Sequence, residues 1–239
     1  MPTDPKILGL AVLAGFAPAL VWLWFWLREN KEKPEPRGVL LMCFIFGMVA
    51  VIFVVPVEKF IQAHVSGDVA QITGWAGVEE LIKYLAVLLI LGRTALIEEP
   101  IDWPIYLITA ALGFAALENT FFLLKPLSLD GTTIGLLSNI HSQFSILTQL
   151  RFLGSTLLHA VSSGLVGIAL GLAFYAGTFT KKFSLIVGLA CAITLHSAFN
   201  FFIIGSSGNN FLKVFGFLWV VTIINMLLLE KLRRMSGEN

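Results

Sequence analysis

The sequence predicts an all-α membrane protein, a polytopic bundle of about seven transmembrane helices. Of the 239 residues, 57% are hydrophobic and only 13% are charged. The hydrophobic residues fall in repeated blocks of about 20 residues, the length that an α-helix needs to cross a bilayer. The net charge of +1 gives no bulk basic character for binding nucleic acid. We therefore expect a single membrane domain over residues 1–239, with the lipid bilayer as a partner and no nucleic acid.

Seven blocks qualify as spans. They cover roughly residues 7–27, 38–57, 74–92, 104–124, 152–176, 184–204 and 211–229. The first block imitates a signal peptide at Ala17-Pro18-Ala19, but the apolar run continues to Leu27, so we expect a retained span. Polar stretches separate the blocks, including one from Glu58 to Thr73. Residues 138–151 have the spacing of an amphipathic helix that lies on the membrane surface or packs in a loop.

The distribution of Lys and Arg predicts the orientation, because cytoplasmic loops carry an excess of both. One side of the predicted bundle has Arg28, Lys31, Lys33, Arg37, Arg93, Lys181, Lys182, Lys231, Arg233 and Arg234. The other side has Lys6, Lys59, Lys125, Arg151 and Lys213. We therefore expect the N-terminus outside and the C-terminus in the cytoplasm.

Polar residues inside the predicted spans gather in one layer. Counted from the outer end of each helix at ~1.5 Å per residue, this layer lies at about 6 to 12 Å depth. It holds Glu79 and Glu80 in the third span, Glu118 and Asn119 in the fourth, His159 in the fifth, and His196 and Asn200 in the sixth. These residues could be unrelated and satisfied locally. A charged group at the centre of a span costs about 2.5 to 3.5 kcal/mol, however, which favours a shared interior site.

The third span contains GVEELIKYLAVLLILG, in which Glu79, Glu80 and Lys83 interrupt an apolar run. On a helical wheel Lys83 lies between the glutamates and one turn deeper, so its ammonium can serve both carboxylates. We expect one carboxylate to hold a proton and the other to be charged, so that a general base and a proton donor coexist. On a soluble helix the same pattern would be an ordinary ion pair. The pair Glu98-Glu99 stands in a polar segment and is assigned no role.

The next three spans each place a second group near an acid or a histidine. Phe114 and Glu118 are four residues apart with Asn119 adjacent, His159 is four residues from Ser163, and His196 is four residues from Asn200. The second group could orient the first or contact a substrate carbonyl, so Phe114, Asn119, Ser163 and Asn200 are predicted substrate-binding residues. A histidine with such a neighbour is also often a packing residue, and that alternative stays open.

Together the motifs resemble the PrsW family of intramembrane proteases. They are EELIK (79–83), FAALEN (114–119), HAVSS (159–163) and HSAFN (196–200), in this order on successive spans. The pattern also looks related to CAAX prenyl endopeptidases and bacteriocin-immunity membrane proteins. The prenyl-endopeptidase pattern has an arginine one position later than Lys83 and a histidine in the second motif, so Lys83 and Glu118 favour the PrsW branch. The resemblance covers about residues 74–204, the expected catalytic core.

The resemblance implies an integral protein of the bacterial cytoplasmic membrane that hydrolyses a peptide bond of a membrane-anchored substrate, such as a single-span anti-sigma factor. Cleavage is expected near the outer face. The residues expected to be catalytic are Glu79, Glu80, Lys83, Glu118, His159 and His196.

Two versions of the chemistry follow. In the metal-free version, which we prefer, Glu79 or Glu80 activates water, Lys83 tunes the glutamate pair, and His159 or His196 with Asn200 stabilises the oxyanion. In the metal version, His159, His196 and one glutamate bind zinc, and a second glutamate is the base. The metal content stays unknown.

Two other function classes compete with the protease. A proton-coupled transporter also uses glutamate, histidine and lysine inside spans, but it would place them on both sides of the midplane. A non-enzymatic scaffold or immunity protein would keep the fold without needing both glutamates. Cleavage of a single-span reporter would discriminate between these classes.

Overall fold

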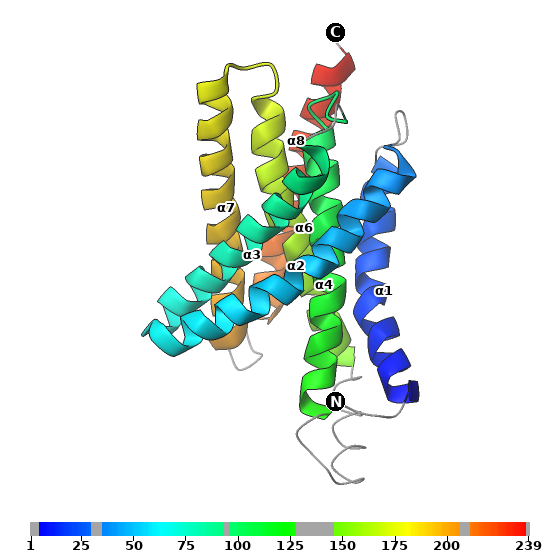
Figure 1. Ribbon diagram of the computed structural model, residues 1–239, viewed down its shortest axis with the longest axis vertical. Coiled ribbons are helices and arrows are strands. Elements are labelled where there is room, and N and C mark those ends of the chain that lie inside the picture. The colour runs from blue at the N-terminus through cyan, green and yellow to red at the C-terminus, as the bar shows by residue number, and fades with distance from the viewer. Residues whose placement is uncertain (1–4, 30–34, 93–95, 128–145, 206–210, 238–239) are drawn as a thin grey trace.

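The computed structural model of the protein describes residues 5–29, 35–92, 96–127, 146–205 and 211–237. Within these residues it contains seven α-helices and no strand, which confirms the predicted all-α class. The helices are α1 (Pro5–Glu29), α2 (Arg37–His64), α3 (Asp68–Leu91), α4 (Asp102–Leu127), α6 (Ile146–Leu172), α7 (Thr178–Gly205) and α8 (Phe211–Gly237). Helix α1 begins at the end of the bundle opposite to the end at which α8 finishes (Figure 1).

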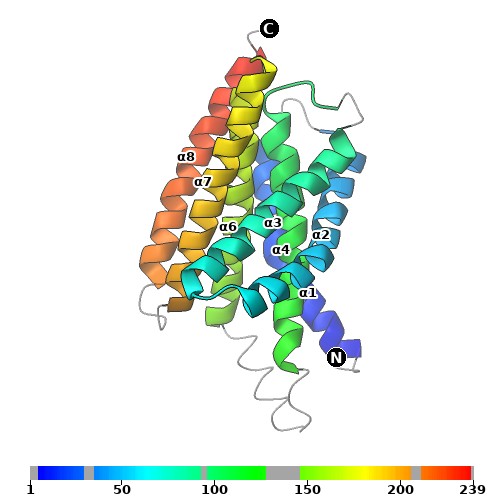
Figure 2. The same cartoon turned by 60° about the vertical axis from the view of Figure 1, so that its left-hand side comes forward.

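Helices α4 and α6 form the centre of the bundle. In each of these two helices, 78% of the most apolar 18-residue stretch is buried. The buried share of the corresponding stretch is 22–33% in α1, α2, α7 and α8. Helices α7 and α8 lie along the outer side of α6 (Figure 2), and α1 packs against α4. Helices α2 and α3 run obliquely across one face of the bundle (Figure 1). The polar residues of the fourth and fifth predicted spans therefore lie on its two innermost helices.

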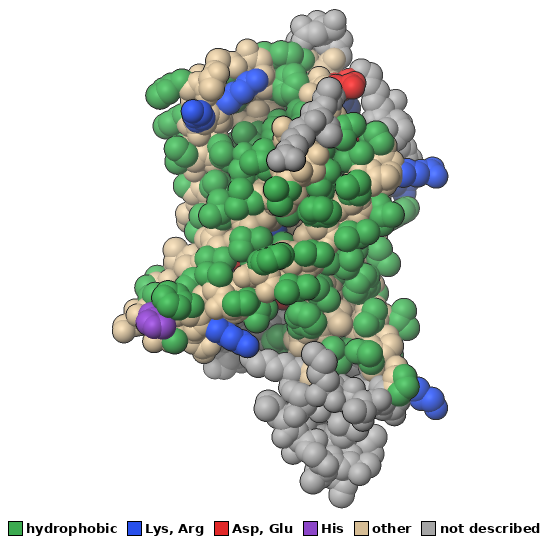
Figure 3. Space-filling view, in the orientation of Figure 1, with side chains coloured by type: hydrophobic (Ala, Val, Ile, Leu, Met, Phe, Trp, Pro, Cys, Tyr) green, Lys and Arg blue, Asp and Glu red, His purple; other side chains and the backbone are tan. Residues whose placement is uncertain are grey.

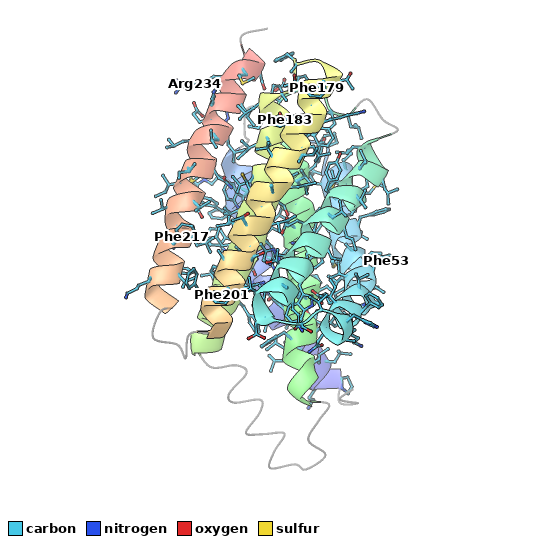
Figure 4. All side chains as sticks on the ribbon, turned by 90° about the vertical axis from the view of Figure 1, so that its left-hand side faces the viewer. Phe53, Phe179, Phe183, Phe201, Phe217 and Arg234 are labelled. Atoms are coloured by element: carbon cyan, nitrogen blue, oxygen red, sulfur yellow. The ribbon has the colours of Figure 1, made fainter. Side chains whose placement is uncertain are left out.

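The surface of the bundle is suited to lipid. Hydrophobic side chains cover most of the face shown in Figure 3, and Lys and Arg appear mainly toward its two ends. Phe53, Phe179, Phe183 and Phe217 point away from the bundle in Figure 4, and each is 52–84% exposed. In the described part of the chain, six helices are long and apolar enough to cross a membrane. The remaining helix is α3, whose 24 residues would also suffice in length but include Glu79, Glu80 and Lys83.

The turn between α2 and α3 differs from the prediction. The sequence predicts that the polar stretch from Glu58 to Thr73 separates two spans, but in the structure α2 continues to His64 and α3 begins at Asp68. The short connection contains Gly67 at φ 92°, a left-handed conformation that favours glycine because it has no Cβ. The two helices thus form a hairpin, which brings Glu58 onto a helix that packs against α3.

The surface helix predicted over residues 138–151 lies mostly outside the described residues. The part from Ile146 onward forms the first turn of α6. Two of the tryptophans of α1 pack inward, since Trp22 and Trp26 are each only 6% exposed, whereas Trp24 faces outward. The Trp22 indole donates a hydrogen bond to the carbonyl of Leu153 on α6 at 3.1 Å.

Two glycines allow α2 and α4 to approach closely. A Cβ on Gly47 would lie 1.9 Å from the carbonyl oxygen of Ala110, and one on Gly113 would lie 2.0 Å from that of Phe44. Because backbone atoms cannot yield, Gly47→Ala or Gly113→Ala should force the helices apart and lower the free energy of unfolding by about 1–3 kcal/mol. Thermal or denaturant unfolding in detergent would measure this loss.

The matched control is Gly38→Ala, because Gly38 lies on α2 and a Cβ there meets no atom within 4 Å. This variant should leave the free energy of unfolding unchanged or raise it slightly, since alanine favours a helix more than glycine does. Equal stability of all three variants would contradict the proposed importance of this helix contact.

Candidate active site

Helix α3 turns its three ionisable side chains toward the interior of the bundle. Glu79, Glu80 and Lys83 are 3%, 1% and 0% exposed. The Lys83 ammonium lies 2.8 Å from Glu80 Oε1 and 3.5 Å from Glu79 Oε2. This is the pairing of one ammonium with two carboxylates that the spacing of EELIK predicts.

The carboxylate of Glu80 is held by donors from three helices. Its Oε1 accepts hydrogen bonds from Lys83 Nζ at 2.8 Å and from His196 Nδ1 on α7 at 2.9 Å. Its Oε2 accepts a hydrogen bond from the hydroxyl of Ser163 on α6 at 2.7 Å. Glu80 therefore fixes the position of the neighbouring side chains, and both of its oxygens are already occupied.

His159 of α6 is held in a similar way. Its Nε2 lies 2.8 Å from Glu118 Oε2 on α4, and its Nδ1 lies 2.9 Å from Lys83 Nζ. Since a carboxylate only accepts and an ammonium only donates, Nε2 carries the proton and Nδ1 presents its lone pair. The ring of Phe114 packs near both His159 and Lys83. Its centroid lies 5.5 Å from that of the His159 ring and 4.5 Å from Lys83 Nζ.

Glu79 lies between the two histidines. Its Oε2 is 3.7 Å from His159 Nδ1 and 3.7 Å from His196 Nε2. The two imidazole rings are 5.0 Å apart and nearly perpendicular. His196 donates its Nδ1 proton to Glu80, so its Nε2 lone pair faces Glu79, whereas the Nδ1 lone pair of His159 accepts a hydrogen bond from the Lys83 ammonium. Unlike Glu80, Glu79 therefore lies beside an imidazole nitrogen, His196 Nε2, that has no hydrogen-bond donor among the described residues.

This arrangement fits a metal ion. Glu79, His159 and His196 each offer one ligand atom, and these atoms lie within 4.8 Å of one another. Each histidine donates its other N–H to a carboxylate, His159 to Glu118 and His196 to Glu80, which is how metal-binding histidines are commonly oriented. Two histidines and one glutamate form a known zinc ligand set. The Lys83 ammonium contacts His159 Nδ1 and would have to give way to an ion there.

Glu58 joins the site from α2, although the sequence indicated no role for it. Its carboxylate is close enough to those of Glu79 and Glu118 and to the Lys83 ammonium to interact with their charges. The indole of Trp75 donates a hydrogen bond to the Glu58 carbonyl at 3.2 Å. Helical spacing places Glu58 on the same face of α2 as Val51 and Val54, which the structure shows to be buried, but the spacing does not indicate that this face meets α3.

Three of the four predicted substrate-binding residues have partners inside the protein. Ser163 binds Glu80 and Phe114 packs against His159, as described above. The Asn119 amide donates to Thr156 on α6 at 3.0 Å and so joins the two central helices. Asn200 is half-buried and, among the described residues, has no hydrogen bond to this cluster. Contact of these residues with a substrate stays a prediction.

Comparisons with known proteins identify the family that the chain resembles. A family model described as "PrsW family intramembrane metalloprotease" matches residues 35–229. A protein named Protease PrsW from Geobacillus kaustophilus is 28% identical over 116 residues, which are 47% of this chain and 52% of that protein. This chain therefore spans about half the length of that relative.

Two further relatives match over most of their length. The Protease PrsW of Oceanobacillus iheyensis is 23% identical over 89% of this chain and 93% of that protein. The Protease PrsW of Shouchella clausii is 25% identical over 94% of this chain and 96% of that protein. No solved structure matches.

Proposed function

Because the chain belongs to the PrsW family of intramembrane proteases, we propose that it hydrolyses a peptide bond of a membrane-anchored protein at the cluster around Glu79. One observation carries the proposal: Glu79, His159 and His196, from three different helices, present ligand atoms to one point. Glu118 on a fourth helix and Glu80 hold the two imidazoles in place. Buried acids and histidines that converge in this way are typical of hydrolytic sites.

The donor set supports the metal version of the chemistry. Glu79, His159 and His196 would hold a zinc ion, and such an ion supplies Lewis acidity that polarises a carbonyl and activates water. Glu80 keeps the His196 ring fixed, and its negative charge supports the basicity of that ring. Glu118, whose side chain is 40% exposed, is then the carboxylate that water can reach and that can accept its proton. Without a metal, Glu79 itself would be the base.

The position of the site favours a substrate that approaches from one end of the bundle. Glu118 lies nine residues before the end of α4 at Leu127, and His196 lies nine residues before the end of α7 at Gly205. Both distances correspond to about 14 Å of helix, and both helices end on the side where α1 begins (Figure 1). The Lys and Arg distribution predicts this side to be external. We therefore expect cleavage in the outer part of the substrate's membrane segment or just beyond it.

The test uses the purified chain of 239 residues with a single-span reporter protein in liposomes. We expect cleavage, about one zinc ion per chain by elemental analysis, loss of cleavage after dialysis against a chelator, and recovery with added zinc. Cleavage that is insensitive to chelation would overturn the metal version and favour Glu79 as the base.

Absence of cleavage from a folded sample would contradict the proteolytic function itself. A pH-sensitive dye inside the same liposomes would then distinguish the alternatives. Proton-dependent flux would favour a transporter, and neither flux nor cleavage would favour a scaffold of the same fold.

A further inference from the structure

A cavity of about 260 Å³ lies between the first turns of α3 and the last turns of α7. It is lined by Val69, Ile72, Thr73, Ser197, Ala198, Phe201 and Phe202. Figure 4 shows Phe201 at the end of α7 that lies beside the beginning of α3. The small side chains of Ser197 and Ala198 leave the space that larger residues would fill. None of the lining residues belongs to the cluster around Glu79.

The cavity is apolar in its chemistry, although its lining includes two hydroxyl groups. Thr73 Oγ1 donates to the carbonyl of Val69 at 2.8 Å, and Ser197 Oγ donates to the carbonyl of Ile193 at 2.6 Å. Both hydroxyl protons are thus used within their own helices. An occupant with unsatisfied polar groups would gain little there and would lose its hydration. The lining therefore suits a hydrocarbon side chain.

The cavity and the catalytic cluster lie along the same pair of packed helices, α3 and α7. Ile72 lies seven residues before Glu79, which is two helical turns on the same side of α3 and about 10 Å of helix. On α7, Ser197 directly follows His196. The other end of the cavity opens toward the lipid-facing surface, since Phe201 and Phe202 are 42% and 53% exposed. A chain entering from the bilayer would meet the cavity before the cluster.

We propose that this cavity is a specificity pocket that binds one large apolar side chain of the substrate's membrane segment. The proposal rests on the proteolytic function above. An extended chain advances about 3.3 Å per residue, so a separation of about 10 Å places the bound side chain roughly three residues from the scissile bond. The substrate must be extended here, because the backbone of a helix shields its peptide bonds. A lipid acyl chain is the competing occupant.

The experiment uses reporters whose residues around the cleavage site are all alanine except for one phenylalanine, which is moved one position at a time. The wild-type chain should cleave best, by roughly ten-fold in kcat/KM, when this phenylalanine lies about three residues from the scissile bond. Ala198→Leu, which fills the cavity, should abolish this preference and leave cleavage of the all-alanine reporter within about two-fold. The matched control is Ala190→Leu, because Ala190 is exposed on the same helix.

A second variant covers the chance that filling the cavity disturbs folding. Phe201→Ala removes part of the cavity wall at an exposed position and should reduce the positional preference by about three-fold or more. A flat positional profile in the wild type, or a profile that neither variant changes, would overturn the proposal, and the second result would favour a lipid in the cavity. Failure of the wild type to cleave any reporter would instead count against the proteolytic function.

Discussion

Glu79→Gln is expected to lower kcat for reporter cleavage by about 10³-fold or more. Glutamine keeps the size of glutamate but can neither accept a proton from water nor bind a metal ion as a carboxylate does. The loss is expected in both versions of the chemistry, because Glu79 Oε2 is the carboxylate oxygen that faces both imidazoles at 3.7 Å. Steady-state kinetics in liposomes would measure it. The fold should persist, since the shortest contact of this oxygen with a nitrogen is the 3.5 Å one with Lys83.

The natural control is Glu98→Gln, which makes the same chemical change in the only other pair of adjacent glutamates in the chain. Glu98 is exposed before α4, and its described hydrogen bond is made by its backbone N–H to Asp102, which the substitution keeps. This variant should retain wild-type kinetics. Residual activity above a tenth of the wild-type value in Glu79→Gln would remove Glu79 from the reaction.

Much of this site was predictable from the energetic cost of charge inside a membrane. A span that carries Glu79, Glu80 and Lys83 is costly unless the three pair with one another inside the protein. Helical periodicity then indicates which face they share, and the structure shows this face to be buried. The histidines were predictable for the same reason, as polar groups at one depth on neighbouring spans.

The distinction between Glu79 and Glu80 was not predictable. Their local sequence is nearly symmetrical, and only tertiary packing brings Ser163 and His196 to Glu80 rather than to its neighbour. Glu58 was missed for a different reason. It follows Pro56 and precedes Lys59, which looks like the end of a span, yet α2 continues through the proline. Local sequence cannot show that the hairpin with α3 carries this residue back toward the site.

Glu80→Gln is expected to cause the largest loss of stability among conservative substitutions in the site. It removes the nearer of the two carboxylates that compensate Lys83, whose side chain is fully buried, and the loss of one partner of a buried ion pair typically costs about 3–5 kcal/mol. The free energy of unfolding should fall by roughly this amount, as measured by denaturation in detergent. Cleavage should also fall by about 10- to 100-fold in the fraction that stays folded, since His196 loses the carboxylate that orients it.

The double variant Glu80→Gln with Lys83→Met separates these two effects. Methionine removes the buried ammonium and fills similar space, so most of the lost stability should return, because replacing both partners of a buried ion pair costs far less than removing one. Activity should not return, since a neutral glutamine amide cannot support the His196 ring as the Glu80 carboxylate does. If stability stays low in the double variant, the Lys83 charge is not what Glu80 compensates. If activity recovers together with stability, Glu80 acts only on the fold, and the assignment of His196 orientation to it is wrong.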